Sequence, residues 1–368
     1  MIRRSLPWLF ASLWLAVTQG SLAAGQLDDP LPIRNQLPLS LPFLEQTPRS
    51  AYLLPAGAVC VALTMDYEST LIASDGILDR YRADDFMTLD GLVSKPVVEQ
   101  TAAASPSGNA YYVDGETLRA VVDVRVGIAR RFEAGMEIPL LLHTAGFMDP
   151  LIDSFHSTLG LPDGGRGWFA RDQSVVAYAD HGDILYVDDA QGGVRPGDLS
   201  LSGRGTLAQD REGRASLAGA ITLKLPTGRA DRLDGSGSVD LGAGLQASWR
   251  LDRSTWHAGY QYTRLGGWSL EPSMSLRDRQ SFSGAYVFRL NPRASIIGQI
   301  LGTFGPFPHR DDGDLGEPAL ELAAGMRHAG PHHLQIEWAL LESLSNPLNI
   351  PDVGFHFGLT YARPPAGG

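Results

Sequence analysis

The stretch Gly237-Ser-Val-Asp-Leu-Gly-Ala-Gly-Leu-Gln-Ala-Ser-Trp-Arg-Leu251 decides the fold, because apolar and polar side chains alternate along it. Leu241 and Trp249 fall on one parity, whereas Asp240 and Arg250 fall on the other. Successive side chains of a β-strand point to opposite faces, so the stretch predicts a strand with one apolar and one polar face. Such a strand suits the wall of a transmembrane β-barrel, which meets lipid outside and a polar lumen inside.

The same alternation recurs along the chain and predicts about twelve strands, within a range of roughly 10–14. An even number of antiparallel strands is typical of a bacterial single-chain barrel. A soluble β-sandwich would alternate in the same way, so the connections must discriminate between the two architectures. The expected strands span residues 58–68, 116–128, 132–142, 198–208, 213–225, 237–251, 254–264, 280–290, 293–304, 318–328, 331–341 and 352–361.

The connections between these strands alternate between short and long. Outer-membrane barrels have short turns on the periplasmic side and long loops outside, whereas a sandwich has no reason to sort its connections in this way. We therefore expect an all-β fold, a closed antiparallel transmembrane β-barrel over residues 58–361. Short turns are expected at 129–131, 209–212, 252–253, 291–292 and 329–330, and long polar extracellular loops at 69–115, 143–197, 226–236, 265–279, 305–317 and 342–351.

Residues 1–23 have the features of a cleaved signal peptide. A positively charged start precedes an apolar run, and Ser21-Leu22-Ala23 matches the small-x-small pattern of a cleavage site. The apolar run is too short to cross a bilayer as a helix. We expect export to the outer membrane of a Gram-negative bacterium, with residues 24–57 as an N-terminal periplasmic segment and residues 362–368 as a C-terminal tail.

The chain is acidic, with 30 Lys and Arg against 41 Asp and Glu. This surplus argues against a nucleic-acid partner. Cys60 is the only cysteine, which excludes an intrachain disulfide, and we interpret it as a small side chain on a strand. We expect no cofactor. The expected partners are outer-membrane lipid, lipopolysaccharide, the barrel-insertion machinery and a small solute that the sequence does not identify.

Charged residues of the predicted strands gather on the parity opposite to the apolar side chains. A charge on the lipid face would cost about 2–4 kcal/mol near the midplane, so these residues are expected to face the lumen. Their even balance of six basic and six acidic residues disfavours a strongly selective pore of one sign. Two readings stay open: the residues line a path, or they hold the wall together by ion pairs. The expected lumen-lining residues are Arg119, Asp123, Arg125, Glu133, Glu137, Lys224, Asp240, Arg250, Arg289, Glu321, Arg327 and Glu337.

The second long loop, residues 143–197, contains a predicted amphipathic helix over 150–160. Leu151, Phe155 and Leu159 have helical spacing, and Gly160 ends the pattern. This helix either folds into the mouth as a constriction or caps the rim. The side chains expected to narrow the mouth are Asp153, Phe155, His156 and Arg166.

Catalytic and metal-binding patterns are weak in this sequence. His156 and Ser157 are adjacent, but neighbouring helical residues do not face each other, which makes them a poor catalytic pair. The acidic stretch Asp311-Asp312-Gly313-Asp314 lacks the ligand spacing of a calcium loop. We therefore predict no catalytic residues, no metal ligands and no enzymatic activity.

Several motifs outside the strand pattern carry a resemblance to a known family. They are Pro30-Leu-Pro-Ile-Arg-Asn-Gln-Leu-Pro-Leu39, Asp114-Gly115-Glu116 leading into Arg119, Phe155-His156 with Gly160-Leu-Pro-Asp-Gly-Gly-Arg166, and Gly197-Asp198-Leu199. Together they resemble a family of uncharacterised proteobacterial outer-membrane proteins, known only as a domain of unknown function. The resemblance implies a β-barrel and no assigned activity. Leu225-Pro-Thr-Gly228 also resembles barrels associated with the uptake of aromatic compounds.

Three functions stay open at this point. The preferred one is a passive or weakly selective channel for small solutes, suggested by the charged lumen and the helical insert. The second is a closed barrel whose extracellular loops bind a ligand or lipopolysaccharide, which predicts a lumen plugged by side chains. The third is a lipid-modifying hydrolase, which requires a Ser, a His and an acid to converge at the outer rim.

Overall fold

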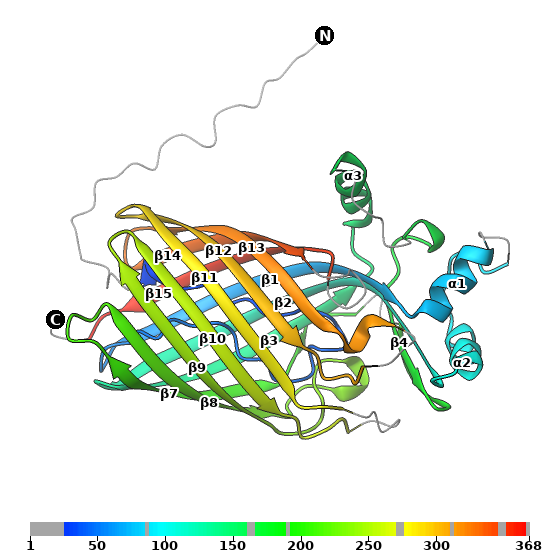
Figure 1. The fold of residues 1–368 in the computed structure, drawn as a ribbon, viewed down its shortest axis with the longest axis horizontal. Helices are drawn as coiled ribbons and strands as arrows, with labels where there is room; N and C mark the ends of the chain where they lie inside the picture. The colour runs from blue at the N-terminus through cyan, green and yellow to red at the C-terminus, as the bar shows by residue number, and fades with distance from the viewer. Residues whose placement is uncertain are drawn as a thin grey trace, which may run out of the picture.

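The chain forms a closed ring of antiparallel strands in a computed structural model that describes residues 26–84, 88–159, 166–188, 192–269, 276–309, 313–344 and 351–365. Twelve strands make the wall (Figure 1), and β1 closes the ring by pairing with β15. This confirms the predicted fold class and strand number. The wall strands are β1 (Val59–Ala73), β2 (Asn109–Ala129), β3 (Phe132–Thr144), β7 (Leu199–Gln209), β8 (Ala215–Leu225), β9 (Asp240–Leu251), β10 (Ser254–Arg264), β11 (Arg279–Asn291), β12 (Ala294–Phe304), β13 (Pro318–Ala329), β14 (Leu334–Ser343) and β15 (Val353–Arg363).

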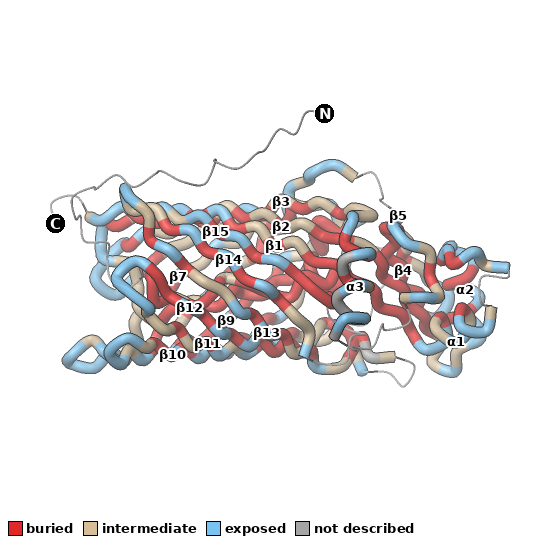
Figure 2. Tube along the Cα trace, turned by 90° about the horizontal axis from the view of Figure 1, so that it is seen from above, coloured by how far each residue is buried: buried red, intermediate tan, exposed pale blue. Residues whose placement is uncertain are grey.

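The apolar side chains of the alternating strands lie on the outer face of the barrel. On β9, Leu241, Leu245 and Trp249 have exposed fractions of 52%, 49% and 55%, whereas the intervening Asp240 and Gln246 are buried. Figure 2 shows exposed and buried residues alternating along the barrel strands. A β-sandwich would bury the apolar parity between two sheets, so this exposure excludes the sandwich.

Short and long connections lie at opposite ends of the barrel (Figure 1). The tight turns, such as those at 252–253 and 292–293, define what we call the turn end, and the opposite end is the loop end. None of the helices among the described residues is long and apolar enough to cross a membrane.

A small cap extends the barrel at the loop end. It consists of α1, α2, β4, β5 and the adjoining ends of β1 and β2 (Figure 1). The part of β2 that precedes Glu116 no longer pairs with β3. It pairs with β4 instead, and β4 in turn pairs with β5. The sequence predicted only polar loop over 69–115, and a single helix over 143–197, so these elements are a correction. Their bounds are α1 (Asp75–Asp84), α2 (Lys95–Ala104), β4 (Val175–Asp180) and β5 (Asp183–Asp188).

Both faces of the cap sheet are covered by apolar side chains. On one face the ring of Phe169 packs against Tyr81 of α1 and Tyr112 of β2, with centroids 4.9 and 5.0 Å away. On the other face Tyr178 packs against Phe307, with centroids 5.5 Å apart. A strand buried on both faces is apolar without alternation, which explains why the period-two pattern did not reveal β4.

The remaining short elements surround the rim. The helix predicted over 150–160 corresponds to α3 at the loop end (Figure 1), where its Ile152 packs in one apolar cluster with Val353 of β15. The bounds are α3 (Asp149–Leu159), η2 (Arg166–Trp168), β6 (Arg195–Pro196), η3 (Ala230–Arg232) and η4 (Asp314–Gly316).

Residues 26–57 form a plug inside the barrel. The segment starts at the turn end with η1 (Gln26–Asp28), rises to the cap and returns to the turn end, where it enters β1. The blue segment between the wall strands in Figure 1 follows this course. We call residues 28–36 the ascending limb, residues 37–43 the tip and residues 44–57 the descending limb.

The plug corrects the expectation that residues 24–57 lie in the periplasm. Its backbone bonds to wall residues at both ends, for example from Leu31 N to Gln299 Oε1 (2.8 Å) and from Gly57 N to Gly127 O (2.7 Å). Its many prolines lack an N–H donor, so the segment makes no strand of its own and its remaining polar groups pair with wall side chains. The expected signal peptide, residues 1–23, lies outside the described residues.

Candidate functional site: the plugged lumen

One carboxylate anchors the plug at the turn end. Asp28 forms ion pairs with Arg250 of β9 (3.0 Å) and with Arg289 of β11. The backbone carbonyl of Asp28 also accepts a hydrogen bond from Nε2 of His257 on β10 (2.5 Å). Three wall strands therefore converge on the point where the plug begins.

The wall pairs with the backbone of the ascending limb. Arg327 donates to the carbonyls of Asp29 (2.6 Å) and Pro30 (3.1 Å). The amide of Gln299 accepts from the N–H of Leu31 (2.8 Å) and donates to its carbonyl (3.0 Å). The side-chain amide therefore replaces the strand neighbour that this extended segment lacks.

An apolar patch of the inner wall holds the same limb. Leu31 and Ile33 are almost fully buried, and they pack with Val287, Ile297 and Leu341 from β11, β12 and β14. Burying a large aliphatic side chain contributes roughly 1.5–3 kcal/mol, so this patch fixes the ascending limb more firmly than its hydrogen bonds alone.

Arg34 braces the tip of the plug. Its guanidinium donates to the carbonyls of Phe43 (2.9 Å) and Leu41 (3.4 Å), which ties the ascending limb to the far side of the tip. Leu37 and Leu39 insert into the apolar core of the cap. The tip therefore joins the plug to the cap.

Lys224 of β8 holds the tip from the wall side. The Lys224 ammonium donates to the carbonyl of Pro42 (2.6 Å) and to the carboxylate of Asp198 (2.7 Å), and it lies 3.0 Å from Asp240. Asp240 in turn accepts from the N–H of Leu44 (2.9 Å). These charges are buried, but each has an oppositely charged partner.

Ion pairs dominate the upper part of the descending limb. Glu45 and Arg279 form a pair in which each side chain has an exposed fraction of 1%. Arg49 bridges Asp123 of β2 (3.1 Å) and Glu137 of β3 (2.8 Å). The limb therefore contributes both a carboxylate and a guanidinium to the wall.

Polar contacts continue to the turn end. Glu133 accepts from the N–H of Leu54 (2.9 Å) and from Arg204 of β7 (2.9 Å). The hydroxyl oxygen of Ser248 accepts from the N–H of Ala51 (2.8 Å). No apolar cluster comparable to the patch around Ile33 includes residues 45–57 in the described part of the chain.

The residues predicted to line the lumen are placed on the inner side of the wall. Arg125 bonds to Asp123 (3.0 Å), Glu337 bonds to Arg327 (2.7 Å), and Arg119 and Glu321 are buried. The structure brings Asp123, Glu133, Glu137, Lys224, Asp240, Arg250, Arg289 and Arg327 into contact with the plug.

The sequence analysis did not identify four charged residues of the plug and two wall arginines that contact it. The missed residues are Asp28, Arg34, Glu45, Arg49, Arg204 and Arg279. Arg204 lies within a predicted strand, on the polar parity, and was identifiable by the same rule as the others. The plug residues offered only a weaker signal, charged side chains spaced along a proline-rich segment.

Arg166 joins three segments of the rim through ion pairs and a hydrogen bond. Its guanidinium pairs with Asp149 at the start of α3 (2.8 Å) and with Asp352 next to β15, and it donates to the hydroxyl of Ser69 (3.3 Å). Burial alone would lower the pKa of Arg166, but the charge of Asp352 and the hydrogen bond to it outweigh burial and raise the pKa. The structure therefore places Arg166 in an ion-pair cluster at the rim, and its role in narrowing the mouth stays a prediction.

The other loop candidates have separate positions. Asp153 pairs with the exposed Arg171 (2.5 Å). The side chains of Phe155 and His156 lie outside the described part of the chain. The hydroxyl of Ser157 donates to the carbonyl of Ser154 within α3 (3.0 Å). Within the described ranges, no group of three or more His, Cys, Asp and Glu residues is arranged to hold a metal ion.

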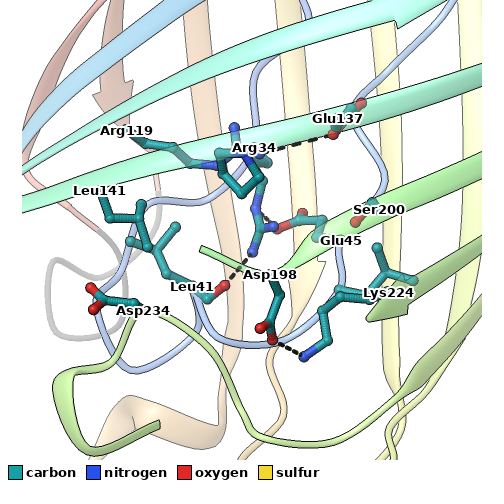
Figure 3. Close-up of a pocket in the computed structure, with 12 residues that line it drawn as sticks. Arg34, Leu41, Glu45, Arg119, Glu137, Leu141, Asp198, Ser200, Lys224 and Asp234 are labelled. Carbon is teal, nitrogen blue, oxygen red and sulfur yellow. Dashed lines mark hydrogen bonds and ion pairs between the residues drawn. The ribbon is translucent and has the colours of Figure 1, made fainter. Parts of the chain in front are cut away.

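Two adjacent cavities lie beside the descending limb. The upper and lower cavities leave about 20 and 30 Å³ of space for water-sized groups, are partly open to solvent, and share Glu45, Glu137 and Ser200 in their linings. Figure 3 shows the upper cavity, with Arg34 of the plug and Arg119 of β2 beside each other. Both cavities therefore lie between the plug and strands β3, β7 and β8.

Several buried polar atoms of charged side chains have no hydrogen-bond partner among the described residues. They include Nη1 of Arg119, Nε of Arg204, both carboxylate oxygens of Glu68 and one carboxylate oxygen of Glu321. Arg119 lines the upper cavity and Arg204 lines the lower one.

Comparison with known proteins identifies a family and a fold. The model of the family described as "Protein of unknown function (DUF3187)" matches residues 93–362, which leaves the motif at 30–39 outside the match. No curated protein sequence matches the chain. The crystal structure of the COG4313 outer membrane channel from Pseudomonas putida F1 is similar, with a TM-score of 0.52 and 13% sequence identity, over 87% of this chain and 99% of that one.

Two further solved structures resemble this chain less closely. The toluene transporter TodX of Pseudomonas putida has a TM-score of 0.39 and 10% identity, over 84% of this chain and 90% of that one. A FadL homologue of Pseudomonas aeruginosa has a TM-score of 0.36 and 12% identity, over 91% of this chain and 99% of that one. At these identities the likeness concerns the fold alone.

Proposed function

We propose, on the premise that this chain belongs to the DUF3187 family, that it is an outer-membrane channel for small polar solutes whose lumen is narrowed by its own residues 26–57. The observation that carries the proposal is a set of buried polar atoms in the lumen that have no hydrogen-bond partner among the described residues, on Arg119, Arg204 and Glu68. The fold, which is that of an outer-membrane channel, supports the same proposal.

A buried charged side chain whose polar atoms lack hydrogen bonds is costly in a dry interior. Desolvating an ion costs several kcal/mol, and such groups persist in proteins when water or another ion reaches them. The two cavities beside Arg119 and Arg204 provide space for water next to these groups. We infer a hydrated path along the descending limb, between the plug and strands β3, β7 and β8.

Solutes larger than water require this limb to move. The descending limb is held by ion pairs and hydrogen bonds, which exchange readily with water, whereas the ascending limb also has an apolar patch. The ring of strands closes through β1 and β15 independently of the limb. The wall can therefore stay intact while the descending limb shifts.

A reversible crosslink tests the proposal. The hydroxyl oxygens of Ser50 and Ser248 lie 3.4 Å apart, so Ser50→Cys with Ser248→Cys, made in a Cys60→Ser background, would tie the descending limb to β9. We expect the reduced protein to conduct ions in planar bilayers, and we expect oxidation to lower the conductance to that of a protein-free bilayer. Reduction should restore it.

A disulfide within the wall is the matched control. Gln261 and Ser281 face each other on β10 and β11, and Gln261→Cys with Ser281→Cys leaves the plug untouched. Oxidation of this control should not change the conductance. Absence of conductance steps in both redox states of both variants would remove the channel proposal.

A closed barrel that binds a ligand at its loop end is the second candidate. The apolar cap over that end favours it, because the tip of the plug and the cap share one packed core. It predicts no conductance in the reduced crosslink variant. It also predicts that deleting α1 and α2 abolishes ligand binding while the wall remains folded.

A further inference from the structure

We infer that the upper cavity binds the carboxylate group of a small solute between Arg119 and Arg34. The inference deepens the proposed function. It rests on that function in one respect: the bound solute is taken to be one that the channel carries. The binding site itself follows from the geometry of the cavity.

Arg119 is a buried cation whose side chain faces the cavity. Its exposed fraction is 4%, and its Nη1 has no hydrogen-bond partner among the described residues. The nearest carboxylates, those of Glu137 and Asp66, lie 3.9 and 4.0 Å from its terminal nitrogens. These separations are too long for hydrogen bonds.

Three neighbouring carboxylates have closer cationic partners. Glu137 is 2.8 Å from Arg49, and Oδ1 of Asp66 is 2.6 Å from Nδ1 of His356. Asp198, which also lines the cavity, is 2.7 Å from Lys224. Each of these acids therefore has a cation closer than Arg119. Arg119 keeps only the two longer ion pairs, and its Nη1, without a hydrogen-bond partner among the described residues, is available to an anion from solution.

Arg34 supplies a second guanidinium to the same cavity. Its Nη2 is used by backbone carbonyls, but its Nε has no hydrogen-bond partner in the described part and lies 3.7 Å from Glu45, which pairs more closely with Arg279. Figure 3 shows Arg34 and Arg119 approaching each other from the plug and the wall. Two like charges repel, and an anion between them relieves that repulsion.

The geometry favours a carboxylate over a spherical ion. A guanidinium presents N–H groups in a planar fork that matches the two oxygens of a carboxylate. The narrow space beside the plug limits the ligand to the size of formate or acetate unless the descending limb moves. The lower cavity continues toward the turn end past Arg204, whose Nε also has no hydrogen-bond partner in the described ranges. A second cation therefore lies along the same route.

Calorimetric titration of the full-length protein in detergent with sodium formate tests the site. We expect formate to bind, Arg119→Gln to weaken binding by at least about tenfold, and Arg119→Lys to weaken it less, because lysine keeps the charge but loses the fork. Arg211→Gln, at an exposed turn on the opposite end, is the matched control and should bind as the unmodified protein does. Equal thermal melting temperatures of all variants would show that they are folded. If Arg119→Gln does not fold, the comparison of Arg119→Lys with the unmodified protein tests the site.

Two comparators complete the titration. Formamide has nearly the same shape as formate without the charge, and chloride has the charge without the shape. Binding of formamide as tight as formate, or formate binding unaffected by either change at Arg119, would overturn the anion site and leave water as the occupant. Chloride binding as tight as formate would overturn the carboxylate assignment.

The two proposals fail in different ways. Formate binding needs no passage through the barrel, so a protein that binds formate through Arg119 but never conducts would refute the channel and keep the site. A protein that conducts while formate binding is indifferent to Arg119 would keep the channel and refute the site.

Discussion

The two limbs of the plug run through the same barrel, but the wall holds them by different kinds of contact. The ascending limb buries Leu31 and Ile33 in an apolar patch, and Gln299 pairs with its backbone. The descending limb contributes Glu45 and Arg49 to ion pairs, and both cavities lie beside it. Apolar packing fills space completely, whereas charged groups need solvent or partners around them. The comparison therefore separates a fixed limb from a hydrated one.

Glu45→Gln should give the largest effect on this comparison. It leaves Arg279 buried without its carboxylate, which costs about 3–5 kcal/mol. Hydrogen exchange at the amides of Leu44 and Ala51 should accelerate by about a hundredfold or more, while the amide of Leu31 stays unchanged. Equal acceleration at Leu31 would mean that the limbs open as one unit.

Ile33→Ala is the converse experiment on the ascending limb. Truncating a buried Ile costs about 2–5 kcal/mol, and we expect the lower end because the patch borders a hydrated lumen. Exchange should accelerate at Leu31 and not at Ala51. Ile296→Ala removes the same atoms from the outer face of β12, where the side chain is exposed, and should leave both amides unchanged.

Raising the ionic strength from about 0.1 M to about 1 M should give the smallest effect. Salt shortens the range of charge interactions from about 10 Å to about 3 Å. Ion pairs that cavities connect to solvent, such as that of Arg49 with Glu137, should weaken by less than about 1 kcal/mol. Exchange measured at both salt concentrations should rise slightly at Ala51 and stay constant at Leu31. A rise at Leu31 alone would reverse the assignment of the two limbs.

The wall was predictable because its signal is local. Alternation between neighbouring residues located β10 at its observed bounds, residues 254–264, and placed Asp123 and Lys224 on the polar parity. The plug was not predictable in this way, because Leu31 meets Gln299 at a sequence separation of 268 residues. No local pattern near Leu31 predicts that contact. The prolines of this segment also prevent the strand periodicity by which the wall strands were predicted.

The sequence therefore predicted only one of the two arginines of the candidate site. Parity gave the wall residue Arg119, but its relation to Arg34 depends on a segment that was expected outside the barrel. The cap was missed for a different reason, since Val175 to Ala179 are all buried and form a continuous apolar run. Alternation detects surfaces that face two environments, and β4 faces only one.

Because the plug enters and leaves the barrel at the same end, it is a hairpin-shaped insert with no thread running through the ring. Such an insert can leave the barrel without any chain terminus passing through the pore. A protein domain fused ahead of Gln26 would therefore not prevent the plug from leaving. The ring closes where β1 meets β15, directly after the insert, so the same topology allows residues 26–57 to enter the barrel from the turn end after that seam has formed.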